Sequence, residues 1–356
     1  MRIWWWLWSG CPGLGVVRMG ALQAVAQEAS LGLDDLWWWS SSRLQQALGW
    51  SDAVMGTVDR YRASQGESPD LEVPAGVVLP MDAEWPISLD RLERRPLALH
   101  CHGDQTLLPS LGQRRAVAVV GTRSASSHGV QMAEQLGRSL AEAGWPVLSG
   151  LAEGVDAAVH RGCLSAEGCP VAVLGTPLNR TYPRHHEALQ KAVGSKGLLL
   201  SELRAGQRVQ PGHFAARNRM LVAMASALVV VECPERSGAL ISAQLARQLQ
   251  CPVWVIPADV SRWSARGSNR LLQGEASALL NPEELIHALG PGPRPLTELG
   301  PSETGLLAAL GHGASLNELA VTQRRSIRSL MPELVALELS GRVVCESGFL
   351  WKPSRR

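Results

Sequence analysis

Lysine is nearly absent from this chain: only three of its 34 basic residues are lysines, a bias that a GC-rich genome explains more simply than selection for arginine chemistry. Acidic residues almost balance the basic ones, and the formal net charge is +2. The balance is uneven along the chain. Between Arg204 and Arg270, nine arginines stand against three acidic residues, a local excess of six positive charges. A basic segment of this kind indicates an anionic partner, although the total charge does not.

Disulfide and membrane signals are also lacking. The seven cysteines are odd in number, are scattered and form no Cys-x-x-Cys pair, which indicates a reducing, cytoplasmic environment. No run approaches the ~20 apolar residues of a membrane span, so we expect none. The opening MRIWWWLWSGC resembles a secretory leader, but its apolar run is shorter than the usual 7–15 or so residues and no small-residue cleavage site follows. We therefore expect no export.

Two common nucleotide-binding motifs and a metal site are missing too. No GxxxxGK[ST] segment occurs, so there is no P-loop, and GTRSAS at 121–126 lacks the later glycines of a dinucleotide fingerprint. The two histidines of HCH at 100–102 have no apparent third ligand. His185 and His186 are adjacent and diverge on a helix. We therefore expect neither a cofactor nor a metal.

What the chain does have is enough apolar sequence for two or three domains, with 46% apolar and 19% charged residues among 356. Residues 1–64 predict a small helical module, SAM-like or helix-hairpin-helix-like, with a linker at 64–76. Its Gly-x-Gly turn could offer backbone N–H groups to a phosphate, but a tight turn is the simpler interpretation. Its tryptophans could stack bases, although packing between helices explains them more simply.

The central part of the chain alternates between short apolar runs and helical patterns. Strands are expected at 116–120, 146–150, 171–175, 197–202, 227–232 and 252–257. Because these runs do not alternate with polar residues, they indicate a parallel sheet that is covered on both faces. The sequence thus predicts an α/β, doubly wound, Rossmann-like domain at 77–289 with its core at 115–289. In such sheets ligands bind beyond the carboxyl ends of the strands.

The C-terminal part follows a Pro/Gly-rich linker at 290–303. Residues 303–354 read as helix, turn, helix, turn, helix and two short strands, which predicts a winged helix. Arg324, Arg325 and Arg328 could dock on DNA, but winged helices also bind proteins, and the sequence favours neither.

Glycines, hydroxyls and arginines follow the predicted strands. Gly121 and Arg123 come after the first strand, and Arg236, Ser237 and Gly238 come after the fifth, each group before a helix N-terminus. These are groups that hold phosphate. None of the loops offers a convincing nucleophile or base, so the sequence favours binding over catalysis.

The loop after the second strand carries a possible catalytic couple. Asp156 and His160 are four residues apart and share one helical face. An acid in the first turn of a helix is also explained by the helix dipole, and we favour that interpretation. Gly150 and Gly154 in the same loop permit a close backbone approach.

The segment PGHFAARNR at 211–219 places two arginines next to an apolar run. On a helix Arg217 and Arg219 point to different sides, so they could grip two phosphates of one strand with Asn218 between them. Phe214, one of only two phenylalanines, precedes them where a base could stack. The alternative is that the arginine stems merely cover the edge of the core.

In this order the motifs resemble the DprA/Smf family, the DNA-processing proteins of natural transformation. The resemblance is specific over 115–289 and weaker over 82–104, and it rests on VAVVGTRSAS, LSGLAEGVDAAVHRG, VAVLGTPLNRTYP, LLSELRAG, PGHFAARNRMLVAMASALVVVECPERSGALISAQLA and ARGSNRLLQGEA. It implies a single-stranded DNA-binding recombination mediator that protects incoming DNA, loads the recombinase RecA and commonly dimerises through the Rossmann-like domain. Because the loops offer no nucleophile or base, we expect no enzymatic activity.

The resemblance also implies which residues bind DNA. The family's phosphate-gripping positions fall on Gly121, Arg123, Ser149, Gly150, Arg217, Asn218 and Arg219. The family's usual lysine before Ser-Gly is here Arg236. Two further departures are Glu153, where relatives often carry a basic residue, and His213, which replaces a more frequent asparagine.

Two other functions stay open on the sequence. Similar Rossmann-like folds hydrolyse nucleoside monophosphates with a loop that ends in a placed glutamate. The corresponding loop here, ERSGALISA, has no acid in the following helical turn, so no catalytic residue is predicted. A regulatory module that uses its winged helix on duplex promoters is the other alternative, and it predicts a preference for duplex DNA.

Overall fold

The structure is a computed structural model that describes residues 1–66, 69, 72–274, 276–294, 306–307, 309–311, 313–323, 325–339, 341–346 and 350–354. The chain divides into two units, Met1–Arg294 and Pro295–Arg356. No helix within the described residues is both long enough and apolar enough to cross a membrane.

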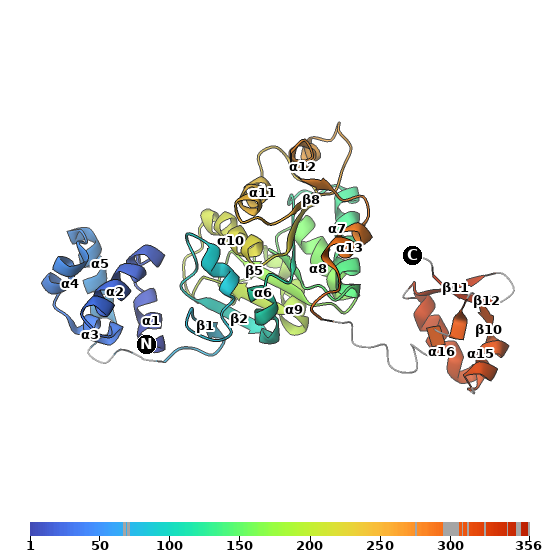
Figure 1. The fold of residues 1–356 in the computed structure, drawn as a ribbon, viewed down its shortest axis with the longest axis horizontal. Helices are drawn as coiled ribbons and strands as arrows, with labels where there is room; N and C mark the ends of the chain where they lie inside the picture. Colours follow the sequence, from blue (N-terminus) through green and yellow to red (C-terminus); the bar gives the residue numbers. More distant parts are fainter. Residues whose placement is uncertain are drawn as a thin grey trace. The chain divides into compact units, whose positions relative to one another are not determined.

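A nine-stranded sheet organises the first unit (Figure 1). Its order is β1-β2-β6-β5-β4-β3-β7-β8-β9. The parallel strands are β3 (Val117–Val120), β4 (Val147–Ser149), β5 (Pro170–Leu174), β6 (Leu198–Ser201), β7 (Ala227–Val230), β8 (Val253–Val255) and β9 (Ser277–Ala278). Two antiparallel strands, β1 (Val77–Val78) and β2 (Leu99–Gly103), extend the β6 side. The six expected parallel strands are thus confirmed.

Helices cover both faces of the sheet, as the unbroken apolar strands predict. One face packs against α7 (Ser127–Glu142), α8 (Val155–Ser165), α9 (Glu187–Lys196) and α13 (Pro282–Leu289). The other face packs against α6 (Leu108–Gly112), α10 (Pro211–Ala223) and α11 (Gly238–Gln248). In Figure 1, α7, α8 and α13 lie together on the side away from α10 and α11. The doubly wound α/β prediction is confirmed.

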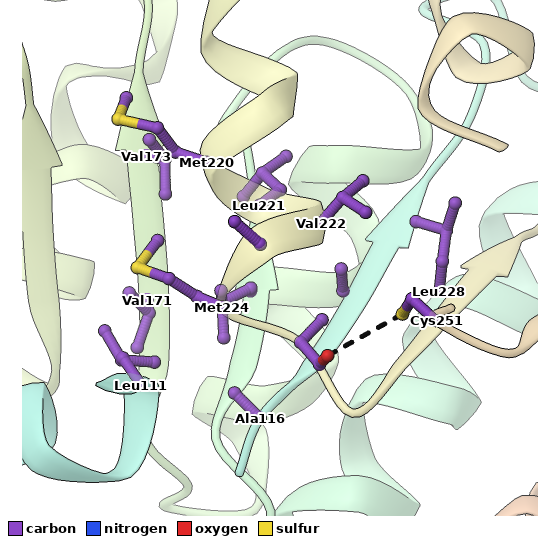
Figure 2. Close-up of a cluster of buried hydrophobic side chains, with 14 of the residues drawn as sticks. Leu111, Ala116, Val171, Val173, Met220, Leu221, Val222, Met224, Leu228 and Cys251 are labelled. Atoms are coloured by element: carbon purple, nitrogen blue, oxygen red, sulfur yellow. Dashed lines mark hydrogen bonds between the residues drawn. The ribbon is translucent and has the colours of Figure 1, made fainter. Parts of the chain in front are cut away.

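Helix α10 carries the arginine segment and is anchored by its apolar second half. Pro211 occupies its first turn, where its missing N–H costs nothing, and His213 accepts a hydrogen bond from the Gln210 N–H at 3.2 Å. Figure 2 shows Met220 and Met224 extending from α10 toward the strand that bears Val171 and Val173. The helix therefore has a fixed orientation over β5.

The first 64 residues form five helices: α1 (Arg2–Ser9), α2 (Val16–Glu28), α3 (Leu33–Trp38), α4 (Ser41–Leu48) and α5 (Asp52–Ser64). Trp5, Trp8 and Trp37 are buried in their common core, which confirms the packing interpretation for these three tryptophans. The Gly-x-Gly segment forms a turn whose Gly13 carbonyl accepts a 2.5 Å hydrogen bond from Arg18. Arg18, the base nearest to that turn in the sequence, is therefore already engaged.

Short elements complete the chain. They are η1 (Ile87–Arg91), η2 (Gln105–Leu107), η3 (Arg184–His186), η4 (Trp263–Ala265) and α12 (Arg266–Leu271) in the first unit, and β10 (Ala314–Ser315), α15 (Leu316–Thr322), α16 (Ile327–Leu339), β11 (Val343–Glu346) and β12 (Leu350–Pro353) in the second. The second unit has the antiparallel sheet order β10-β12-β11. Two helices followed by two strands, α15, α16, β11 and β12, agree with the end of the expected order, whereas β10 was not expected. The winged-helix class stays a prediction.

Of the three arginines expected to dock on DNA in the second unit, Arg324 lies outside the described residues. Arg325 forms an ion pair with Glu333, and Arg328 is exposed.

Candidate nucleic-acid interface

All six central strands, β3 to β8, end at one edge of the sheet, which we call the carboxyl edge. From β3 the chain moves outward through β4 and β5 to β6, and then returns to β7 on the other side of β3. This reversal creates a topological switch point, where open α/β sheets bind their ligands. Arg123 follows β3 and Arg236 follows β7, and both are exposed. Two basic side chains therefore flank the switch point.

Arg217 lies inside this edge and is only 4% exposed. Its position on α10 explains the burial, because residues three, four and seven positions later share its helical face. Those residues, Met220, Leu221 and Met224, are fully buried in the core. The Arg217 guanidinium donates a 2.6 Å hydrogen bond to the Val173 carbonyl and lies 3.9 Å from the Asp156 carboxylate.

Gly150 and Asp156 form the cradle of this arginine. A Cβ atom at Gly150 would lie 1.4 Å from the Arg217 Nη1 atom, so only glycine leaves room for the guanidinium. Burial raises the pKa of Asp156, and the neighbouring Arg217 opposes that rise. Burial also lowers the pKa of Arg217, which Asp156 in turn counteracts. The two charges thus compensate each other inside the protein.

The structure corrects the expected accessibility of three candidate phosphate ligands. Arg217 binds within the protein, Gly150 is buried beneath its guanidinium, and the Ser149 hydroxyl donates a 2.7 Å hydrogen bond to the Val119 carbonyl. The physical reason is the apolar face of α10, which draws the arginine stem inward. Arg217 therefore packs beneath the carboxyl edge, where it stabilises the fold and does not face solvent.

Arg219 points to a different side of α10, as expected, but it is engaged as well. Its guanidinium contacts the two carboxylate oxygens of Glu202 at 2.8 and 2.5 Å. Further hydrogen bonds reach the carbonyls of Arg94 and Ala216. Glu202, the residue after β6, therefore forms a bidentate ion pair with Arg219. The structure does not show the expected pair of free arginines on either side of Asn218.

An aromatic and basic cluster stands at the surface instead. The Arg123 guanidinium lies 5.5 Å from the centre of the Phe214 ring, and the Tyr182 ring lies 4.8 Å from that ring at a tilt of 46°. Phe214 rests on Gly175, where a Cβ atom would come within 2.7 Å of the ring. Sequence reasoning missed Tyr182, although its signal was there: it is one of two tyrosines and it follows the third predicted strand.

Asn218 and the loop after β7 form the other side of the edge. The Asn218 amide donates a 3.0 Å hydrogen bond to the Ser242 hydroxyl, and its nitrogen would lie 3.8 Å from a Cβ atom at Gly238. The Ser237 hydroxyl caps α11 by accepting a hydrogen bond from the Ala239 N–H at 3.2 Å. The structure therefore brings Asn218, Ser237 and Gly238 together, next to the exposed Arg236.

The Gly121 loop is held in place by close packing and by a buried acid. A Cβ atom at Gly121 would lie 2.4 Å from the Val155 side chain. The Glu232 carboxylate accepts hydrogen bonds from the Ser126 hydroxyl at 2.7 Å and from the Ser264 hydroxyl at 2.5 Å. Glu232, which sequence reasoning missed, thus joins the loops that follow β3 and β8.

The possible catalytic couple is not formed. His160 is fully buried, and neither of its ring nitrogens has a hydrogen-bond partner among the described residues. Burial, with Arg217 and His186 nearby, lowers the pKa of His160 to about 3. The imidazole is therefore neutral at pH 7, while Asp156 is directed to Arg217.

Glu153 has a partner at the surface. Its carboxylate lies 3.3 Å from the Nε2 atom of His185. Within the described residues, no three or more His, Cys, Asp or Glu side chains are grouped so as to hold a metal ion.

Comparisons with known proteins agree with this architecture. Residues 76–290 match the model of the family described as DNA recombination-mediator protein A. The chain is 30% identical to Protein Smf of Synechocystis sp. over 293 residues, which cover 81% of this chain and 73% of that protein. It is 34% identical to the putative DNA processing protein DprA of Mycobacterium tuberculosis over 297 residues, which cover 76% and 75% of the two chains.

Two solved structures are also similar. DNA processing protein A of Streptococcus pneumoniae matches with a TM-score of 0.64 and 25% identity, over 78% of this chain and 94% of that one. DNA processing protein A of Helicobacter pylori, described as having a unique single-stranded DNA binding mode, matches with a TM-score of 0.51 and 30% identity, over 57% and 91%. Together with the family match over more than half of the sequence, these similarities show that the chain belongs to the DNA recombination-mediator protein A family, that of the DprA and Smf proteins.

Proposed function

We propose that this protein binds single-stranded DNA along the carboxyl edge and performs no reaction on it. The observation that carries the proposal is the surface cluster of Arg123, Phe214 and Tyr182 on the carboxyl edge, between the loops that follow β3 and β5. Aromatic rings stack on unpaired bases, and a nearby guanidinium contributes both charge and a planar face. The similarity to the Helicobacter pylori protein supports the same class of ligand.

In this proposal the expected DNA-binding residues take three roles. Arg123 and Arg236 contact phosphates, assisted by Asn218, Ser237, Gly238 and the Gly121 turn. Phe214 and Tyr182 stack a base. Ser149, Gly150 and Arg217 hold α10 beneath these contacts. The Ser149 hydroxyl and the Arg217 Nη1 atom donate hydrogen bonds inside the protein, and Gly150 leaves room for the guanidinium.

We also propose a specific biological role for this DNA binding. As a recombination mediator the protein protects incoming single strands during natural transformation, loads RecA onto them, acts in the cytoplasm and works as a homodimer. Residues 1–64, 77–289 and 303–354 serve as its three modules. The family description supports the mediator role.

Salt dependence tests the proposal directly. We assume that three cations, Arg123, Arg236 and one other, each neutralise a phosphate. Each neutralised phosphate contributes roughly −0.7 to the slope of log association constant against log salt concentration, so the slope should be about −2. Fluorescence anisotropy of a labelled oligothymidine at several salt concentrations measures the slope. A duplex of equal length should bind more weakly. An affinity that does not depend on salt contradicts the proposal. Tighter binding to the duplex also contradicts it, and supports a regulatory role on duplex DNA.

Glu202 offers a second test, because it competes with phosphate for Arg219. We expect Glu202→Gln to raise the affinity for single strands about threefold to tenfold, largely through faster association, since a negative charge leaves the edge and Arg219 becomes available. Stopped-flow anisotropy measures both rates. Glu142→Gln is the matched control, because it removes one exposed carboxylate at the last residue of α7, the end away from the carboxyl edge. An equal gain in both variants would exclude a specific role for Glu202.

A further inference from the structure

The helical module at residues 1–64 carries an exposed aromatic surface of its own. Trp38, the last residue of α3, is 58% exposed, whereas its neighbour Trp37 is buried. A cavity of about 320 Å³ lies beside it, and Trp37, Trp38, Arg62, Ala63 and Gly66 line this cavity. We call it the Trp38 pocket. The Trp38 ring is supported from within by Trp4, whose ring centre is 6.4 Å away in an edge-on arrangement.

Two arginines border the same tryptophan run. The Arg62 guanidinium lies 6.0 Å from the centre of the Trp37 ring and donates a 2.7 Å hydrogen bond to the Trp39 carbonyl. The exposed Arg43 guanidinium stacks on the Trp39 ring at 3.7 Å. An exposed indole beside guanidinium groups is the combination that binds unpaired bases and their phosphates.

Helix α1 links this surface to the carboxyl edge. Arg204 lies in the loop after β6, and its guanidinium covers the Trp6 ring at 3.5 Å and donates a 2.7 Å hydrogen bond to the Ser9 hydroxyl. Two residues before Trp6, Trp4 contacts Trp38. A strand that leaves the carboxyl edge on the β6 side therefore meets the helical module at α1. It passes around this helix to reach Trp38, because Trp4 and Trp6 lie on different sides of α1.

We propose that the Trp38 pocket holds a base of the same single-stranded DNA that occupies the carboxyl edge. The proposal rests on the function proposed above and adds a second contact to it. A base suits the exposed Trp38 ring better than a phosphate does, because Asp34 lies four residues earlier on the same helical face and repels phosphate. The exposed Arg43 takes a neighbouring phosphate, while Arg62, which lies 4.0 Å from Asp59, holds the tryptophan run in place. A base-paired strand cannot insert a base, so the pocket selects single strands.

The length of the oligonucleotide separates the two sites. We expect Trp38→Ala in the full chain to weaken binding of an oligothymidine of about 30 nucleotides roughly tenfold, and to leave binding of one of about 6 nucleotides unchanged, because the short strand covers one site only. Trp38→Phe, which keeps an aromatic face, should retain most of the affinity. Anisotropy titrations measure these constants, and thermal unfolding shows whether the variants keep the parent's stability.

Crosslinking of the unaltered protein gives an independent reading. Ultraviolet irradiation with an oligonucleotide that contains 4-thiothymidine, followed by peptide mass spectrometry, should mark Trp38 or its neighbours with the long strand only. If the parent binds single strands and Trp38→Ala changes neither the affinity nor the crosslinks, this inference is overturned while the carboxyl-edge site stands. If Trp38→Ala alters only self-association, as seen by sedimentation, the pocket binds protein instead. If the parent binds no single strand, the function proposed above fails first.

Discussion

Replacement of Arg217 by methionine is expected to lower the free energy of unfolding by about 3–5 kcal/mol, the usual effect of removing one partner from a buried ion pair. Methionine preserves most of the apolar stem but leaves the buried Asp156 carboxylate without its cation and the Val173 carbonyl without its donor. Urea unfolding followed by circular dichroism measures the change. Loss of DNA binding in such a variant would then reflect lost structure as much as a lost phosphate contact.

The destabilisation should depend on pH in a definite direction. Burial raises the folded-state pKa of Asp156 above its usual value, and the removal of Arg217 raises it further. A carboxyl group with a raised folded-state pKa favours the folded state at low pH and loses that contribution as pH rises through the folded pKa. The loss caused by Arg217→Met should therefore be larger at pH 8 than at pH 5.

A double variant provides the control for this interpretation. Asp156→Leu combined with Arg217→Met removes both charges, so it should recover a large part of the lost stability, because an apolar pair of similar volume often replaces a buried ion pair at little cost. If Arg217→Met is instead as stable as the parent at both pH values, the guanidinium is not part of a buried pair and is free to bind phosphate after all.

The fold was predictable from local patterns, and so was part of the site. Unbroken apolar runs between helical segments can only be buried on both faces, which gives the parallel sheet and places the binding loops at its carboxyl edge. The inward position of Arg217 could also have been predicted, because Met220, Leu221 and Met224 follow it at three, four and seven positions. Because arginine side chains are mostly exposed in proteins, the residue type alone favours a surface position and opposes the spacing.

Other features of the site depend on contacts between distant segments. Glu202 meets Arg219 only because the residue after β6 lies next to α10. Tyr182 meets Phe214 only because the loop after β5 lies against the start of α10. The spacing of residues within one segment does not predict contacts between distant segments. The tryptophan run at 37–39 shows the same limit: Trp37 is buried and Trp38 is exposed, although the two residues are chemically identical neighbours.

The largest loss of DNA affinity is expected from Phe214→Leu combined with Arg123→Ala. Stacking of one base on an aromatic ring contributes about 1–3 kcal/mol, and loss of a phosphate contact adds to it, so the double variant should bind single strands on the order of 100-fold more weakly. Leucine keeps the contact with Gly175 and so preserves the fold. Anisotropy titrations at one fixed salt concentration measure the change.

Two comparisons decide whether that loss belongs to this cluster. Phe214→Trp with Arg123 intact should retain binding, because indole stacks at least as well as phenyl. Arg138→Ala removes an equal charge from an exposed position on α7, 11 residues and about 16 Å from the start of that helix at Ser127, towards the opposite edge of the sheet. It should cost little beyond a general electrostatic effect. A loss in the double variant no larger than that of Arg138→Ala would mean that the strand is bound by the overall positive field of the domain, and the aromatic cluster would then have no part in recognition.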